Sequence, residues 1–282
     1  MQQPARFERI DYLAIGHITI DQTPHGPRLG GSAAYAALTA QALGWRAGIV
    51  TAWAQELPLG PLAGLPIVNL GAEKSSTFEN IYTPSGRLQR YSGEAPFLEF
   101  HLIPEAWRDP RILHLAPVAR EVSPRILKYF EDSFLGVTPQ GWLRDWDADG
   151  QVRVTHWEEG GLVLNRADAA VLSRTDVSGD QLHIERLAAA CPLLVVTDGE
   201  TGATVYAQGE VHHLSAPAAH AVDPTGAGDI FAAAFFVQLY QGAEPRQAAR
   251  FASVLAARSV ERPGLEGVPS REEIYDLTPE AS

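Results

Sequence analysis

Residues 221–240 read AVDPTGAGDIFAAAFFVQLY, and this stretch decides how the chain folds. A turn of small residues, Gly226-Ala227-Gly228, stands directly before a long apolar segment, which predicts a buried helix over residues 230–240. Backbone N–H groups at such a turn and the positive end of the helix dipole together form an anion site that needs no lysine. Small side chains let a phosphoryl oxygen approach the backbone closely. The stretch therefore predicts an anion hole held by a buried helix.

Asp229 falls in the first turn of this helix, beside the anion hole. A carboxylate at a helix N-terminus can be a simple cap, because Asp is favoured there. Next to an anion hole it can instead act as a general base that holds a hydroxyl in line with a phosphoryl group. Phosphoryl transfer depends on positioning and charge neutralisation more than on covalent chemistry, so this combination suits a kinase.

Short apolar runs bounded by Gly, Pro or Asp recur along the rest of the chain and alternate with helical patterns. Continuous runs of this kind are typical of parallel strands buried on both faces. The strands that we predict span residues 12–15, 47–51, 67–70, 112–115, 161–164 and 193–197. The helices that we predict span residues 33–43, 123–130, 184–190, 230–240 and 245–260. This alternation predicts an α/β fold, doubly wound, with a mostly parallel sheet flanked by helices.

Two stretches interrupt the alternation. Residues 75–99 alternate polar and apolar positions between turn signals, which predicts a small antiparallel β-lid that covers a site. Residues 136–157 carry tryptophans among charged residues and predict a partly exposed ledge. Within the ledge we expect Trp142 and Trp146, with Arg144 between them, to pack on the surface of the domain.

The bulk composition limits the class of protein. No composition shift marks a second domain, so we expect a single domain over residues 1–282. The net charge of -12 argues against a nucleic-acid or anionic-membrane partner, because both need a basic surface. No GxxxxGK[ST] occurs, which excludes a P-loop enzyme. Cys191 is the only cysteine, and no long apolar run is present, so we expect a cytoplasmic protein without disulfides.

The block D-x-x-G-A-G-D, from Asp223 to Asp229, resembles the second signature of the ribokinase (PfkB) family of carbohydrate kinases. The resemblance implies that Asp229 removes the proton from the acceptor hydroxyl and that the amides of residues 226–228 form the anion hole. It also implies a ribokinase-like fold, ATP as donor and Mg²⁺ as its counterion. The family often has a K⁺ near the loop that precedes the anion hole.

Two motifs nearer the N-terminus resemble the parts of the family that bind the acceptor. Asp21 follows the first predicted strand. The family has an Asp at this spacing, and that Asp binds hydroxyl groups of the substrate. Gly30-Gly31-Ser32 opens the first predicted helix and resembles the family's first signature, G-G-N/K-x-x-N-x-A. The resemblance implies that these residues bind the acceptor. Ser32 and Tyr35 depart from the usual Asn or Lys and from the usual Asn, so the identity of the acceptor stays open.

Further motifs resemble the nucleotide side of the family. Asn165 and Asp168 are spaced like its N-x-x-E motif, and the resemblance gives Asp168 a role at Mg²⁺, through water because Asp is one methylene shorter than Glu. Asn165 can alternatively be a helix cap. Residues 196–203 resemble the loop that contacts ATP, and residues 251–264 resemble the adenine-side helix with its following turn. The nucleotide contacts that the resemblance implies are Asn165, Thr197, Gly199, Ala252 and Ala256.

These matches occur in the family's order and span residues 16–264. They predict an ATP-dependent kinase that phosphorylates a hydroxyl of a sugar or sugar-like polyol. A nucleoside kinase of the same family, and a non-catalytic sugar- or nucleotide-binding protein on the same fold, are the alternatives. A dehydrogenase is disfavoured, because no GxGxxG follows the first strand. Residues 22–29 look too few for a hairpin that completes the lid, which argues against a ribokinase-type lid dimer and leaves the oligomeric state open.

Overall fold

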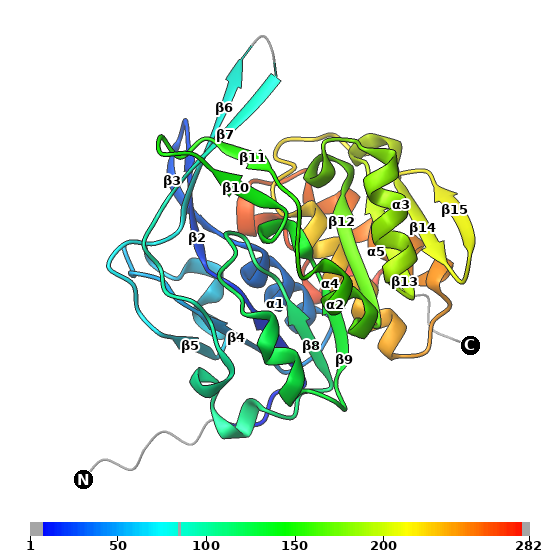
Figure 1. The fold of residues 1–282 in the computed structure, drawn as a ribbon, viewed down its shortest axis with the longest axis horizontal. Coiled ribbons are helices and arrows are strands. Elements are labelled where there is room, and N and C mark those ends of the chain that lie inside the picture. The colour runs from blue at the N-terminus through cyan, green and yellow to red at the C-terminus, as the bar shows by residue number, and fades with distance from the viewer. Residues whose placement is uncertain (1–7, 84–85, 278–282) are drawn as a thin grey trace.

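The centre of the molecule is a nine-stranded sheet in the order β15-β14-β13-β12-β9-β8-β1-β4-β5 (Figure 1). The computed structural model describes residues 8–83 and 86–277. Strands from β13 to β5 in this order are parallel, and β14 and β15 are antiparallel at one edge. The strands are β1 (Tyr12–Ile15), β4 (Ala47–Thr51), β5 (Ile67–Asn69), β8 (Ile112–Leu115), β9 (Phe134–Val137), β12 (Ala169–Ser173), β13 (Leu193–Thr197), β14 (Ala203–Ala207) and β15 (Glu210–Leu214).

Alternate residues of a strand point to opposite faces, so the sheet carries two separate apolar cores. On β1, Tyr12 and Ala14 join one core, and Leu13 and Ile15 join the other. Helices α1, α4 and α5 cover the first face, and α2 and α3 cover the second (Figure 1). The helices are α1 (Ser32–Ala42), α2 (Gly160–Arg166), α3 (Gln181–Ala190), α4 (Ala227–Tyr240), α5 (Pro245–Ser259) and α6 (Arg271–Tyr275). The predicted doubly wound α/β fold is confirmed.

Short 3₁₀ helices make up many of the connections between these elements. They span Gly60–Gly64, Phe100–Leu102, Glu105–Trp107, Pro124–Tyr129, Pro139–Gly141, Arg174–Val177, Gly199–Thr201 and Gly264–Gly267. Across residues 8–83 and 86–277, no helix has the length and hydropathy needed to cross a membrane.

Helix α4 is apolar around its whole circumference, and its residues 230–237 are all buried. A helix of this kind is stable only where protein covers every side. The sheet, α1 and α5 supply that cover. Phe236 lies against β9 at Gly136, where a Cβ would overlap the ring, and against His114, whose ring centroid is 5.0 Å away in an edge-on contact.

The lid is a second sheet of four strands in the order β3-β2-β6-β7, which stands away from the large sheet (Figure 1). Its strands are β2 (Thr19–Thr23), β3 (Gly26–Gly30), β6 (Thr77–Thr83) and β7 (Gly86–Ser92). The β6–β7 hairpin falls in the predicted lid at residues 75–99, of which 84–85 lie outside the described residues. The β2–β3 hairpin was not expected, but two five-residue strands need only the turn Pro24-His25 between them. The argument against a lid dimer therefore loses its basis.

A further hairpin, β10 (Arg144–Trp146) with β11 (Val152–Val154), extends the lid (Figure 1). The N–H of Tyr91 on β7 donates to the carbonyl of Gly150 in the hairpin turn, at 2.8 Å. Trp142 was expected to pack on the surface of the domain, but it is buried in the second core, with its ring stacked on Trp157 at 4.9 Å between centroids. Residues 144–154 of the predicted ledge thus belong to the lid, whereas Trp142 and Trp157 belong to the second core.

Two predicted elements were wrong in kind. Residues 161–164, predicted as a strand, lie in helix α2, where Leu162 is exposed and Val163 is buried. Residues 123–130, predicted as an α-helix, form a 3₁₀ helix. Strands β9 and β12 were not predicted at all. A four-residue apolar run fits a strand and one side of a short helix equally well, so periodicity alone could not separate them.

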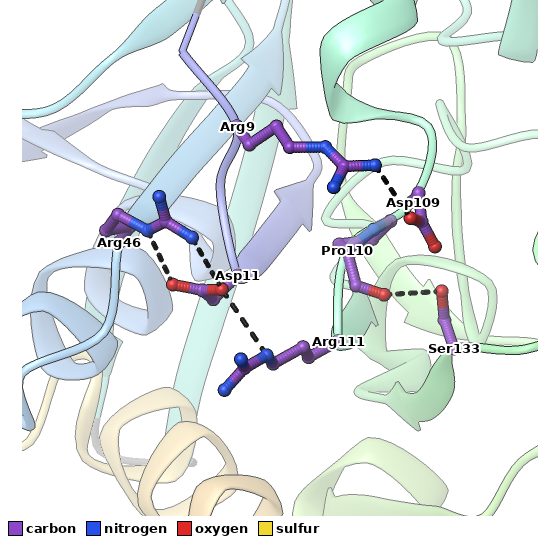
Figure 2. A network of polar contacts seen from close by, with 7 residues as sticks. All are labelled: Arg9, Asp11, Arg46, Asp109, Pro110, Arg111 and Ser133. Carbon is purple, nitrogen blue, oxygen red and sulfur yellow. Dashed lines mark hydrogen bonds and ion pairs between the residues drawn. The ribbon is translucent and has the colours of Figure 1, made fainter.

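Charged side chains close the amino-terminal edge of the sheet (Figure 2). Arg46 donates to both oxygens of the Asp11 carboxylate, at 2.7 and 3.0 Å, and Arg111 Nε lies 3.5 Å from the same carboxylate. The hydrogen bond from Arg46 lowers the pKa of Asp11 below its ordinary value. The Ser133 hydroxyl donates to the carbonyl of Pro110 at 2.7 Å. These contacts tie the starts of neighbouring strands together at this edge of the sheet.

We expect Gly136→Ala to lower the free energy of unfolding by about 1–3 kcal/mol, the usual range for overpacking a core. The new methyl group would overlap the ring of Phe236, which is fully buried and has no room to withdraw. Urea unfolding followed by circular dichroism measures the change.

Gly161→Ala is the matched control. Nothing lies within 4 Å of a Cβ at Gly161, which is exposed in helix α2. The same methyl group should therefore leave the stability unchanged or raise it by up to about 1 kcal/mol. Equal effects of the two substitutions would contradict the packing that we describe for Phe236.

Candidate active site

The site lies at the carboxyl-terminal edge of the sheet, where the N-termini of α1 and α4 meet. Ser32 is the first residue of α1, and Asp229 lies in the first turn of α4. The Ser32 side chain hydrogen-bonds the Asp229 carboxylate, which ties the two helix ends together. Both helix dipoles direct their positive ends at this point, so the position favours a negatively charged ligand.

The turn before α4 has the backbone form that an anion hole requires. Gly226 caps the helix with φ 82°, a left-handed conformation that glycine adopts without strain. The ring of Tyr35, on α1, lies so close below Gly226 that a Cβ there would overlap it. Asp223 accepts hydrogen bonds from the N–H groups of Thr225 and Gly264, both at 3.0 Å. The loop is therefore anchored at its start by Asp223 and from below by Tyr35.

Asp229 has the electrostatic setting of a general base. Packing around its carboxyl group raises the pKa to about 7, and the hydrogen bond from Ser32 opposes this rise. The negative charges of Asp176 and Asp21 raise the pKa further, whereas the positive charge of Arg144 lowers it. The residue keeps intermediate exposure, so a ligand can reach it. A carboxylate with a pKa near the working pH is well matched to proton transfer.

The residues predicted for the acceptor lie around the same point. The Asp21 carboxylate rests on Gly30, where any Cβ would overlap it, and Thr19 Oγ1 donates to Asp21 at 3.2 Å. Gly31 has φ 101° and lies against the carbonyl of His17, so only glycine fits there. The structure thus brings Asp21, Gly30, Gly31 and Ser32 together with the turn at residues 226–229.

Buried polar contacts hold the loops beneath the acceptor side. The Glu121 carboxylate accepts from the N–H groups of His17, Val118 and Ala119, at 2.7–3.0 Å. His17 Nε2 donates to the carbonyl of Pro96, so its Nδ1 accepts from the Ser76 hydroxyl, each at 2.9 Å. One buried carboxylate and one imidazole therefore link the loops after β1 and β8 to the lid.

The residues predicted to bind the nucleotide do not all lie at the same edge of the sheet. Thr197 and Gly199 do lie at the carboxyl-terminal end of β13, the same edge as Asp229. Asn165 ends helix α2, and Asp168 precedes β12 and accepts from the N–H of Leu135 at 2.7 Å. A strand rises about 3.3 Å per residue, so Asp168 lies at the far edge of the sheet from the site. This position does not support contact with a nucleotide at the opposite edge, and the assignment of these two residues stays a prediction.

The two residues of α5 that were predicted to contact the nucleotide differ in exposure. Ala252 is fully buried in the core, where it has no surface to offer a nucleotide. Ala256 is half-buried on the same helix and stays a candidate contact.

The residues that the sequence reasoning missed are Asp176 and Arg144. Ser173-Arg174-Thr175-Asp176 follows the end of β12 with the same N-x-x-E type of spacing, and Ser173 and Asp176 form a capping box. Asp176 also accepts from Gln140 at 3.0 Å and acts electrostatically on Asp229. Ser173 and Asp176, at and just after the end of the apolar run AAVLS (residues 169–173), were a signal that could have been used. They were overlooked because residues 161–164 were predicted as the strand.

No group of three or more His, Cys, Asp or Glu residues suited to a metal ion occurs among the described residues. A Mg²⁺ ion here would have to be bound mainly by phosphate oxygens and water, which is a common arrangement for this ion. The Asp176 carboxylate is an oxygen donor at the correct edge of the sheet. The residues present thus fit a Mg²⁺ that arrives with a nucleotide.

Several known kinases have sequences similar to this chain. Residues 162–271 match the family described as pfkB family carbohydrate kinase. The cytidine kinase of Thermococcus kodakarensis is 26% identical over 259 residues, which cover 83% of this chain and 90% of that enzyme. A fructokinase of Escherichia coli is 27% identical over 188 residues, which cover 61% of this chain and 57% of that protein. The match therefore spans little more than half of the fructokinase.

The fold also has solved counterparts. The structure of a pyrophosphate-dependent kinase in the ribokinase family, complexed with a pyrophosphate analog and myo-inositol, superposes with a TM-score of 0.78 at 19% identity. The alignment covers 94% of this chain and 99% of that one. The fold and the site together define a small-molecule kinase with an alcohol group as acceptor. The chain resembles the pfkB family of carbohydrate kinases in its matched part, residues 162–271, and shares the fold of the ribokinase-family structure over 94% of its length.

We expect Asp229→Asn to stabilise the protein above pH 7. Asp229 has a folded pKa of about 7 against an ordinary value of 3.8, so the folded state binds the extra proton between these values. The free energy of unfolding contributed by this group therefore falls as the pH rises from about 4 to 7. Asparagine does not titrate, so the variant should gain a few kcal/mol at pH 8, at about 1.4 kcal/mol per pH unit, and much less at pH 5.

Urea unfolding at pH 5 and pH 8 measures this difference. Asp132→Asn serves as control, because Asp132 is exposed and lies on a loop away from the site. A pH-independent effect of Asp229→Asn would show that the carboxyl group does not have the raised pKa.

Proposed function

We propose that the protein transfers the γ-phosphoryl group of ATP to a hydroxyl of a sugar or sugar-like polyol, with Asp229 as the catalytic base. The observation that carries this proposal is the position of Asp229. Its carboxylate lies in the first turn of α4, beside the Gly226–Gly228 amides, and its pKa is raised to about 7. Asp21 acts on it electrostatically from the lid side, where an acceptor would bind.

In the proposed reaction Asp229 takes the proton from the acceptor hydroxyl as the oxygen attacks the γ-phosphorus. A bond forms between the acceptor oxygen and phosphorus, and the bond from phosphorus to the bridging oxygen of ADP breaks. The amides of residues 226–228 and the N-terminus of α4 stabilise the charge on the transferred group. Asp21 accepts hydrogen bonds from other hydroxyls of the acceptor and so keeps the reacting one in line.

We assign the donor to the edge formed by Thr197, Gly199 and Ala256, with Mg²⁺ near Asp176. Mg²⁺ supplies charge neutralisation on the phosphates of the donor. The K⁺ that the family often has would lie near the loop of Asp223, where Arg28 already brings a positive charge to 4.0 Å from the carboxylate. Comparison of turnover in K⁺ and in a bulky organic cation tests that expectation. A cytoplasmic location suits an enzyme that draws on ATP.

A nucleoside kinase is the alternative that the cytidine kinase match favours. Pyrophosphate as donor is the alternative that the ribokinase-family structure favours. A binding protein on the same fold is the third, and Asp229 argues against it because mere binding needs no base. The ring of Tyr35 below the anion hole leaves the choice of acceptor open, since family members commonly have Asn there.

We expect acceptor-dependent release of ADP from Mg-ATP when the protein meets a panel of sugars, inositols and nucleosides. Asp229→Asn should lower kcat by at least about 10²-fold, the usual effect of a positioned base. The value of kcat/KM for the wild type should rise with pH and level off above about pH 7, since only the carboxylate accepts a proton. Pyrophosphate replaces ATP in a second series to settle the donor.

Asp132→Asn is again the control and should leave turnover unchanged. If Asp229→Asn keeps wild-type turnover, the assignment of the base is wrong. If neither donor binds in calorimetry, the binding-protein alternative replaces the kinase.

A further inference from the structure

The hairpin β10–β11 brings a positively charged side chain to the site. Arg144 is the first residue of β10, and it pairs with Val154 across the hairpin. The hairpin is fixed to the lid by the hydrogen bond from Tyr91 to Gly150, and the rings of Tyr91 and Trp146 lie 4.3 Å apart. Arg144 therefore belongs to the lid, and its hydrogen bond to the carbonyl of Val118 places it over the loop that follows β8, at the carboxyl-terminal edge of the sheet.

Two contacts help to position the guanidinium group. Its central carbon lies 5.1 Å from the centroid of the Phe78 ring, and its Nη1 donates to the carbonyl of Val118 at 3.3 Å. Phe78 pairs with Asp21 across β6 and β2, so the two side chains share one face of the lid. A cation stacked on a ring presents its flat face to the ring and directs its N–H groups sideways in the guanidinium plane.

The side chains that act electrostatically on Asp229 include two carboxylates, Asp21 and Asp176. Asp229 faces Ser32 from α1, Asp21 from β2 and Asp176 from the turn after β12, and Arg144 is the positively charged group that acts on it from β10. The phosphoryl group that enters this position during transfer adds further negative charge. Backbone amides carry only partial charges, whereas a guanidinium carries a full charge and five donors.

We propose that Arg144 is a catalytic residue that hydrogen-bonds the phosphoryl group during its transfer and stabilises the charge on it. The inference rests on the proposed kinase function. In the balanced reaction described above, Arg144 exchanges no proton and forms no covalent bond, because it stays protonated throughout. Since the lid carries Arg144, the charge is complete only when the lid covers the acceptor.

Arg144→Met and Arg144→Lys test the role by steady-state kinetics on the intact chain. Methionine keeps the packing on Phe78 and removes the charge, so kcat should fall about 10²- to 10³-fold while KM for the acceptor changes little. Lysine keeps the charge without the planar donors and should restore part of the loss. Loss of the positive charge should also move the acid limb of the pH profile to higher pH, which a purely structural role would not do.

Arg153→Met is the matched control, because Arg153 is exposed on the same hairpin, and it should leave both kcat and the pH profile unchanged. Inorganic phosphate binding, measured by calorimetry, provides a readout that needs no acceptor. Arg144→Met should weaken it at least about tenfold and Arg153→Met should not. Thermal unfolding of each variant checks that the hairpin stays folded.

The outcomes separate the two proposals. Unchanged kcat in Arg144→Met, with wild-type turnover present, overturns the role of Arg144 and leaves the kinase function intact. If the wild type turns over no acceptor, the proposed function fails, and phosphate binding still decides whether Arg144 contacts an anion. Equal phosphate affinity of wild type and Arg144→Met, or no binding by either, overturns the inference.

Discussion

Burial of helix α4 on every side is the constraint on which the rest of the structure depends. An apolar helix without a polar face has to be enclosed, and here the sheet, α1 and α5 enclose it. The enclosure leaves the two ends of the helix at the surface, and its N-terminus lies at the edge where the parallel strands end. The turn at residues 226–228 and Asp229 are thereby fixed in place, and Ser32 binds Asp229 because α1 packs beside α4. The need to bury α4 thus sets the geometry of the site around Asp229.

The same enclosure gives Asp229 its chemistry. Removal of water from around the carboxylate raises its pKa to about 7, and the neighbouring Asp21 and Asp176 add to that effect. A group kept in this state makes the folded protein less stable at neutral pH than it would be with an asparagine. Burial of the apolar surface of α4 offsets the free energy that the raised pKa of Asp229 costs. The stability of the core thus allows a reactive carboxylate at the end of the helix. Tyr35 has a similar position, since its buried hydroxyl lies near three carboxylates, and its pKa is raised well above the ordinary value, first by burial.

Patterns that are local in the sequence allowed accurate prediction, and long-range ones did not. Strands β1, β4, β8 and β13 and the anion-hole turn follow from apolar runs and glycine spacing, and the family resemblance joined them into one fold. The run at 161–164 is too short to reveal its conformation, and once it was taken as a strand, Asn165 and Asp168 replaced Ser173 and Asp176 at the site. Arg144 acts electrostatically on Asp229 because its hairpin packs against β7, a long-range contact that no spacing along the chain encodes.

The lid is assembled from three segments, residues 19–30, 77–92 and 144–154, that are far apart in the chain. Its β6–β7 hairpin buries one apolar side chain, Phe78, in a small cluster with Val118 and Ala119 from the loop after β8. Such a unit gains little from local contacts and must close long loops before it forms, so it assembles on a sheet that has already folded. Its backbone amides should accordingly open and exchange with solvent without unfolding of the large sheet. Ile20 and Leu29 of the β2–β3 hairpin belong to the first core, whereas the part of the cover formed by β6, β7, β10 and β11 buries little apolar surface. Opening of that part therefore costs less free energy than unfolding of the large sheet.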